Sequence, residues 1–208
     1  MESVLNMFLL LLGGIGWTIV YIGCIRRGLK EKTYAMPLFA LGLNIAWEAI
    51  YAFRGLIVET SPQTYVNLTW MCLDIAIIYT YFKFGKKEFP ENAKKYFVPF
   101  SILAFITCAA IELAFFITFE PLQAAQYSAF AQNAAMSVLF LIMLFRRNST
   151  RGQSMTIAVA KCIGTLAPTL QQGVLWEINP FIIITGTVCF IFDIIYIAMI
   201  YRFKKESK

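Results

Sequence analysis

Four carboxylates lie inside long apolar runs of this chain: Glu48, Asp74, Glu112 and Asp193. An acidic side chain costs a few kcal/mol at the centre of a bilayer, so such residues usually face a cavity or a partner and serve a function. A carboxyl group shielded from water favours its neutral form and can then donate a proton. The structural alternative for each acid is a hydrogen bond between helices. For Glu112 this structural role is favoured, and for Asp74 the structural and functional roles are equally supported. The aromatic neighbours of Glu48 and Asp193 favour a functional role for these two acids.

The chain contains no histidine. This excludes Ser-His-Asp triads, histidine metal sites and imidazole acid-base chemistry. Any proton in the site must therefore be moved by a carboxyl group, a lysine, a tyrosine or water. The five cysteines are odd in number and form no CxxC pair, which predicts neither a disulfide framework nor a zinc site.

The depths of the four acids follow from about 1.5 Å of rise per helical residue. Glu48 is expected about 8 Å below the outer end of its span, and Asp193 about 19 Å below the outer end of its own. Glu112 is expected near the depth of Glu48, with Asp74 between the two levels. Glu48 is therefore predicted to be the shallower acid and Asp193 the deeper one.

Lys161, Gln132 and Asn133 are further polar residues inside the apolar runs. Lys161 is about 9 Å from the inner end of its span by the same rise, so its amine is expected to snorkel to the interface. An ion pair with a buried acid is the alternative. Gln132 and Asn133 are predicted to form hydrogen bonds between helices.

Aromatic residues accompany the acids along the sequence, and the candidates for lining a site are Trp17, Trp47, Tyr51, Trp70, Tyr79, Phe192 and Tyr196. Aromatic faces stabilise cations without offering a nucleophile. For any one of them, packing or an interfacial belt is the favoured explanation. Together with buried acids, they fit a site in which a carbocation is formed and kept from water.

The elements that must position these residues are membrane helices. The chain is 59% hydrophobic and only 14% charged, with a mean hydropathy of +0.67, values typical of a membrane protein. A helix needs about 20 apolar residues to cross a bilayer. Seven such runs lie near 5–25, 35–53, 64–84, 97–118, 124–145, 155–173 and 180–201. We therefore predict an all-α, polytopic seven-helix bundle that forms a single domain over residues 1–208.

The basic residues predict the orientation of this bundle, because Lys and Arg are retained on the cytoplasmic side. Of the 18 basic residues, 16 lie after runs 1, 3, 5 and 7, and the exceptions are Arg54 and Lys161. The N-terminus is thus expected outside and the C-terminus, including Lys208, in the cytoplasm. Anionic lipid headgroups explain the net charge of +6 better than nucleic acid does.

Three segments carry a resemblance to a known family: Trp47-Glu48, Phe192-Asp193 followed by Tyr196, and STRGQSMTIAVAKCIGT at 149–165. In order and span position they resemble the small integral-membrane terpene cyclases of fungal meroterpenoid and indole-diterpene pathways and their bacterial relatives. The resemblance implies non-redox cyclisation of a prenyl chain, begun by protonation of an epoxide or terminal alkene and ended by loss of a proton.

In that family an acid of each motif is needed for activity, which implies that Glu48 and Asp193 are catalytic. The resemblance leaves Asp74, Glu112, Lys161 and Asn133 as possible supporting residues. The Asp-rich DDxxD and DxDD motifs of soluble cyclases are absent, so neither a metal nor another cofactor is expected. The expected partners are membrane lipid and a lipophilic prenylated substrate, with no nucleic acid and no obligate protein partner. The membrane would be the cell membrane in a bacterium and the endoplasmic reticulum in a fungus.

The roles of the two acids stay open. Asp193 is favoured as the proton donor because it is deeper. If Lys161 pairs with Asp193, however, that acid is ionised and suited to accept the final proton, which leaves Glu48 as the donor. The main alternative function is a small proton-coupled transporter of a metabolite, although no three-span repeat supports it.

Overall fold

Residues 2–206 are described by the structure, a computed structural model, and they form seven α-helices. These are α1 (Glu2–Glu31), α2 (Leu38–Ile57), α3 (Pro62–Phe84), α4 (Phe97–Thr118), α5 (Pro121–Arg147), α6 (Met155–Leu170) and α7 (Pro180–Glu206). Two 3₁₀ turns, η1 (Gly85–Glu88) and η2 (Glu91–Tyr96), join α3 to α4, and a π turn, η3 (Gln171–Leu175), follows α6. Each predicted apolar run coincides with one helix, which confirms the all-α class.

Helix ends follow from local sequence. Ser61 and Thr64 form a reciprocal capping box at the start of α3, where Pro62 occupies the first helical turn. The Ser154 hydroxyl accepts a hydrogen bond from the Ile157 amide at 3.2 Å and caps α6. Asn148 adopts a left-handed conformation, with φ 47°, and ends α5.

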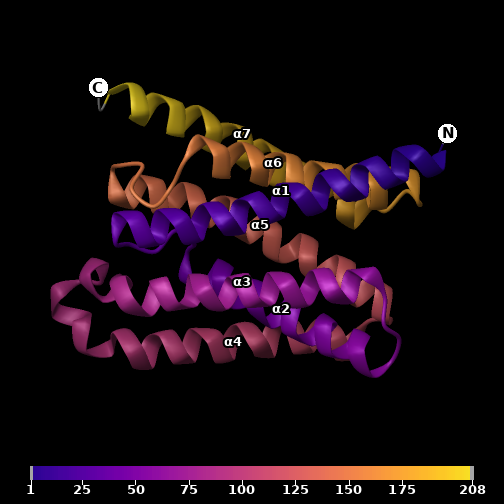
Figure 1. The fold of residues 1–208 in the computed structure, drawn as a ribbon, viewed down its shortest axis with the longest axis horizontal. Helices are drawn as coiled ribbons and strands as arrows, with labels where there is room; N and C mark the ends of the chain where they lie inside the picture. The colour runs from indigo at the N-terminus through magenta and orange to yellow at the C-terminus, as the bar shows by residue number, and fades with distance from the viewer. Residues whose placement is uncertain (1, 207–208) are drawn as a thin grey trace.

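The helices run side by side along one long axis, with the two termini at opposite ends (Figure 1). One group contains α1, α6 and α7, and the other contains α2, α3 and α4. Helix α5 packs against α7 of the first group and against α2 and α4 of the second, while α1 contacts α3. The interface between the groups therefore brings α1, α2 and α3 together, and α5 joins α6 and α7 to the rest.

Close packing of α1 on α6 depends on two glycines. A Cβ atom on Gly16 would lie 2.8 Å from the Cα of Gly164 and 2.9 Å from the carbonyl oxygen of Ala160. Small residues allow helix backbones to approach in this way inside membranes. This contact sets the position of α6, on which Lys161 lies.

The outer faces of the bundle are apolar. Leu103, Ile106 and Ile184 are each more than 60% exposed, whereas the four acids are buried. Within the described residues, four helical segments are long and apolar enough to cross a membrane: Val4–Glu31, Glu91–Thr118, Pro121–Arg147 and Pro180–Glu206. Helix α6 has only 16 residues, and α2 carries the polar residues Asn44, Glu48 and Arg54.

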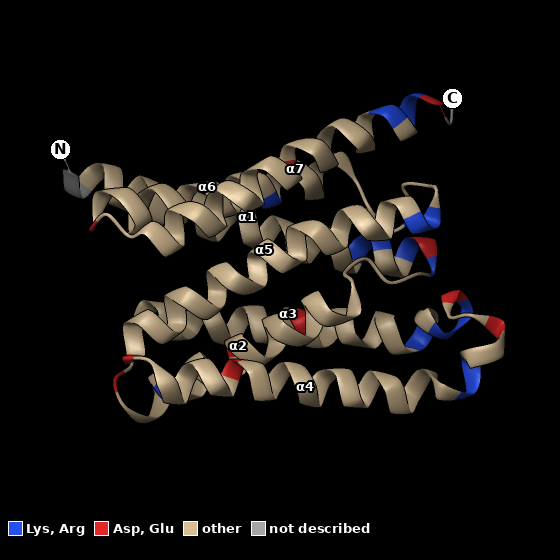
Figure 2. Ribbon diagram, turned by 180° about the vertical axis from the view of Figure 1, so that it is seen from behind, with Lys and Arg blue, Asp and Glu red and all other residues tan. Residues whose placement is uncertain are grey.

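Most of the Lys and Arg residues lie at one end of the bundle (Figure 2). This end holds the C-terminal part of α7 and the connections α1–α2, α3–α4 and α5–α6. Arg54 lies near the end of α2, toward the other end of the bundle, and Lys161 lies inside it. Lys208 is outside the described residues. The one-sided distribution predicted from the loops is therefore present in three dimensions, and we call this part of the molecule the basic end.

Candidate active site

The four acids are buried side chains in three separate groups. Each is at most 1% exposed. Glu48 and Asp74 share one group, Asp193 pairs with Lys161 in a second, and Glu112 lies near Ser128 and Tyr51 in a third.

The Glu48 group combines side chains from α1, α2 and α3. Asn44 precedes Glu48 by one helical turn, so the two face the same side of α2. The Asn44 amide nitrogen lies 3.0 Å from Oε1 of Glu48, 2.8 Å from Oδ2 of Asp74 and 2.5 Å from the Tyr21 hydroxyl. That hydroxyl in turn donates to Oε1 of Glu48. Asp74 of α3 therefore lies beside Glu48 of α2, and the two carboxyl groups share the Asn44 amide.

The Glu48 group differs from the Asp193 group in its charge partners. Within residues 2–206, neither Glu48 nor Asp74 forms an ion pair with Lys or Arg. Two neighbouring carboxyl groups in a low dielectric resist full ionisation, so such a pair tends to retain a proton. Oε2 of Glu48 and Oδ1 of Asp74 are also buried without a hydrogen-bond partner. The group can thus carry a transferable proton.

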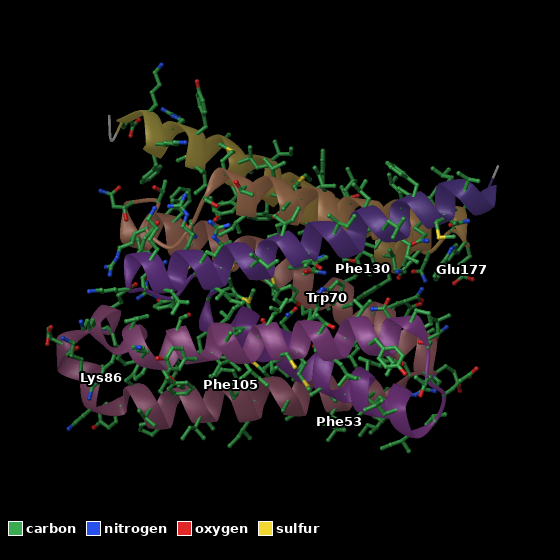
Figure 3. All side chains as sticks on the ribbon, viewed as in Figure 1. Phe53, Trp70, Lys86, Phe105, Phe130 and Glu177 are labelled. Carbon is green, nitrogen blue, oxygen red and sulfur yellow. The ribbon has the colours of Figure 1, made fainter. Side chains whose placement is uncertain are left out.

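Aromatic rings cover the Tyr21 side of this group. The Tyr21 ring stacks on Trp70 with centroids 5.8 Å apart and lies 6.3 Å from Trp17. Trp70 donates its indole N–H to the Thr18 hydroxyl at 3.1 Å, across the space between α3 and α1 seen in Figure 3. Trp17 and Trp70 therefore pack around Tyr21, whose hydroxyl binds Glu48.

Trp47 and Tyr51 form a second aromatic pair on α2, with centroids 4.9 Å apart. The indole N–H of Trp47 donates to the carbonyl oxygen of Ala125 at 3.0 Å, which ties α2 to α5. The Tyr51 hydroxyl, Oε2 of Glu112 and Oγ of Ser128 are buried without hydrogen-bond partners. The interhelical hydrogen bond favoured for Glu112 is thus not made by this oxygen.

The Asp193 group contains an internal ion pair. Nζ of Lys161 lies 2.8 and 3.1 Å from the two carboxylate oxygens of Asp193 and 2.5 Å from the Ser137 hydroxyl. Lys161 is fully buried, so the expectation that it snorkels was wrong. The reason is that Asp193 and Ser137 supply its amine with partners inside the bundle. An adjacent ammonium group favours the ionised form of a carboxyl group.

Two aromatic candidates flank Asp193 on α7. Tyr196 is fully buried, packs edge-on against Phe140 with centroids 5.8 Å apart, and has a hydroxyl without a hydrogen-bond partner. Phe192 is half-buried and packs against the core. Both lie within one helical turn of the acid, but only Tyr196 presents an unused polar group to the interior.

Three sequence predictions are corrected here. Tyr79 is 52% exposed, and its hydroxyl lies 2.5 Å from Nζ of Lys83 on the outside of α3. It follows Asp74 by five residues, or about 140° around a helix, and so occupies another face. The side-chain oxygens of Gln132 and Asn133 are buried without hydrogen-bond partners, so these oxygens do not make the interhelical bonds predicted for both residues. Such atoms are where water or a ligand commonly binds.

Sequence reasoning missed Tyr21, Asn44 and Ser137. The spacing of Asn44, four residues before Glu48, is the one pattern that could have identified it. Tyr21 contacts Glu48, and Ser137 contacts Lys161, the partner of Asp193. Both contacts join helices that are far apart in the sequence, which no local pattern encodes.

The fold and the site define a class: a helical membrane protein whose interior holds one carboxyl pair without a cation and one carboxylate paired with lysine. Residues 2–206 match the family of Pyr4-like transmembrane terpene cyclases, and the chain belongs to this family. The resemblance inferred from the Glu48 and Asp193 motifs is confirmed.

Curated relatives carry the same activity in their names. The chain is 29% identical to terpene cyclase pyr4 of Aspergillus fumigatus, over 95% of the chain and 86% of the relative. It is 33% identical to terpene cyclase atmB of Aspergillus flavus, over 80% of the chain and 69% of the relative. It is 29% identical to terpene cyclase ascF of Acremonium egyptiacum, over 94% and 81%. These matches support an enzyme, a membrane terpene cyclase, over the transporter alternative.

Proposed function

We propose that Glu48 starts a cyclisation by donating a proton and that Asp193 ends it by accepting one. The observation that carries this assignment is the position of Lys161, the one lysine that is buried among residues 2–206. Lys161 forms an ion pair with Asp193, whereas among residues 2–206 no Lys or Arg pairs with Glu48 or Asp74, and two adjacent carboxyl groups without a cation resist full ionisation. We therefore prefer Glu48 as the donor, the assignment expected if Lys161 pairs with Asp193. The alternative, with Asp193 as the donor, was based on depth alone.

The proton donor is held in place by its neighbours. The Glu48 carboxyl group is oriented by the Tyr21 hydroxyl and the Asn44 amide, both bound to Oε1, and Oε2 is left without a partner. The proton that this carboxyl pair retains would be transferred to a substrate oxygen or alkene carbon. Asp74 would stabilise the protonated form of Glu48, because a second charge beside it is unfavourable.

The reaction conserves all atoms. The proton of Glu48 goes to an epoxide oxygen or to a terminal alkene carbon, which creates an electron-deficient carbon. The π electrons of successive alkenes form new C–C bonds, and the final cation loses a proton to the carboxylate of Asp193. The product is an isomer of the substrate. One proton must then return from Asp193 to Glu48, directly or through solvent.

The aromatic lining suits such intermediates. Trp17 and Trp70 lie beside Tyr21, and Tyr196 lies one turn from Asp193. Ring faces attract cationic carbon but do not trap it covalently. These rings suit a lipophilic prenylated substrate that enters from the bilayer, and the proposed reaction requires neither nucleic acid nor a protein partner.

In the membrane, we place all seven helices across the bilayer, with the basic end in the cytoplasm and the N-terminus outside. The gathering of Lys and Arg at one end supports this orientation (Figure 2). The short helix α6 would span with the help of η3, which continues it to Leu175. The membrane would be the cell membrane in a bacterium or the endoplasmic reticulum in a fungus.

The test uses the purified protein in lipid, incubated with farnesylated and geranylgeranylated aromatic acceptors, each as epoxide and as plain alkene. Mass spectrometry should reveal a product of unchanged mass and shifted retention time. Asp193→Asn and Glu48→Gln should each abolish this product. Unchanged formation of the isomer in either variant would overturn the assigned roles, and proton-dependent solute uptake into liposomes without any isomer would favour the transporter.

A further inference from the structure

A cavity of about 430 Å³ opens at the basic end, away from the acids. It lies where the first turns of α2 and α4 meet the last turns of α5, beneath η1. Figure 3 marks this end with Lys86 of η1. None of the four buried acids lines the cavity. Its volume falls within the range of about 300–1,000 Å³ that is common for small-molecule sites.

The lining of this cavity carries an excess of positive charge. Arg146, Arg147 and Arg151 face a single acid, Glu88, which leaves a formal charge of +2. Arg147 already has partners within the protein. Its guanidinium group lies 2.8 Å from a carboxylate oxygen of Glu88, and its Cζ lies 4.3 Å from the centroid of the Tyr34 ring. Arg151 lies 3.7 Å from Glu88 and donates to the carbonyl oxygens of the α1–α2 connection.

Arg146 is the basic residue of the cavity that remains available. It is exposed, and among the described residues it has no hydrogen-bond or ion-pair partner. A guanidinium group presents a planar set of N–H donors that matches a phosphate group. Its position at the rim therefore favours an anionic ligand.

The cavity also reaches the lipid-facing surface. Phe39, Phe100 and Ile142 line it and are 39%, 42% and 44% exposed. These residues come from α2, α4 and α5, so an apolar chain that leaves the cavity between these helices would enter the bilayer directly. A free inorganic anion has no apolar part that could pack against these three side chains.

We propose that this cavity binds an anionic phospholipid. Its phosphate lies at Arg146, and an acyl chain leaves over Phe39, Phe100 and Ile142. Negatively charged lipids concentrate at the cytoplasmic leaflet, where basic membrane-protein segments attract them. The site is distinct from the buried acids, so the inference does not depend on which of them donates the proton.

The test is native mass spectrometry of the detergent-purified protein with equal amounts of phosphatidylglycerol and phosphatidylcholine. Phosphatidylglycerol should be retained preferentially. Arg146→Gln should weaken that retention about fivefold, the usual effect of one basic residue near an anionic surface. Arg202→Gln is the matched control, because Arg202 is exposed at the same end but does not line the cavity. Ile142→Trp, which narrows the apolar exit, should weaken retention without a change of charge.

Equal retention of the two lipids, or equal effects of Arg146→Gln and Arg202→Gln, would overturn the proposal. Displacement of phosphatidylglycerol by inorganic phosphate alone would overturn the lipid assignment, because it would reduce the site to a simple anion site. Thermal unfolding of each variant in the same detergent shows whether it is folded. Arg146 and Ile142 are both exposed at the cavity rim, so folding should be retained.

Discussion

The ion pair between Lys161 and Asp193 predicts a specific pattern of stabilities. Lys161→Met would leave Asp193 as an uncompensated buried charge, since both side chains are at most 1% exposed. Removal of one partner of a buried pair costs about 3–5 kcal/mol. For a chain of 208 residues, at about 2–4 °C per kcal/mol, the midpoint of thermal unfolding should fall by about 6–20 °C.

The double variant Lys161→Met/Asp193→Asn should recover most of this loss. It removes both charges, and neutral replacement of a buried pair is often without net cost. Asp193→Asn alone should be as unstable as Lys161→Met, because it leaves the ammonium group unpaired. The double variant therefore separates the loss of charge pairing from the loss of the carboxylate.

A thiol-reactive fluorophore gives the assay. Cys72 is exposed and reacts in the folded protein, so the signal is the further labelling of Cys24, Cys108, Cys162 and Cys189, which are buried and react only when the bundle opens. Lys204→Met, at the exposed end of α7, is the control and should leave the midpoint unchanged. A midpoint for Lys161→Met within about 2 °C of the wild type, or a double variant no more stable than the single variants, would refute the assigned pairing.

Three further predictions concern the neighbours of the acids. Tyr21→Phe should lower turnover about tenfold and cost about 1–3 kcal/mol of stability, because it removes a buried hydrogen bond to Glu48; product formation and thiol labelling measure the two effects, and wild-type turnover would contradict the orienting role. Tyr79→Phe should leave turnover unchanged, since that hydroxyl lies on the outside of α3; a loss of activity would return Tyr79 to the site. Glu112→Gln should retain most of the turnover, and abolished product in a folded variant would place Glu112 in the chemistry.

Much of the helical arrangement could be predicted, because apolar runs of membrane length determine helices directly. The motifs around Glu48 and Asp193 likewise indicated the family. The partners of these acids could not be predicted in the same way. Lys161 was expected at the interface, since its depth is compatible with snorkelling, and its burial depends on Ser137 and Asp193 from two other helices.

The pairing of Asp74 with Glu48 shows the same limit. A rise per residue places a side chain along its own helix, but a shift of a few residues between helices changes which acids meet. Asn44 fixes the actual register, because its amide lies within 3.0 Å of oxygens from both Glu48 and Asp74. Tyr79 was misplaced because closeness along the sequence ignores rotation around the helix.

The most direct test of the central claim compares Glu48→Gln with the double variant Lys161→Met/Asp193→Asn on the substrate that the wild type converts. Loss of a general acid typically lowers the rate by about 10²–10⁴-fold. Glu48→Gln should therefore leave the substrate intact. The double variant should still protonate it and release diverted products, such as water-captured alcohols or misplaced alkenes. Diverted products from Glu48→Gln together with unreacted substrate in the double variant would reverse the roles and contradict this account.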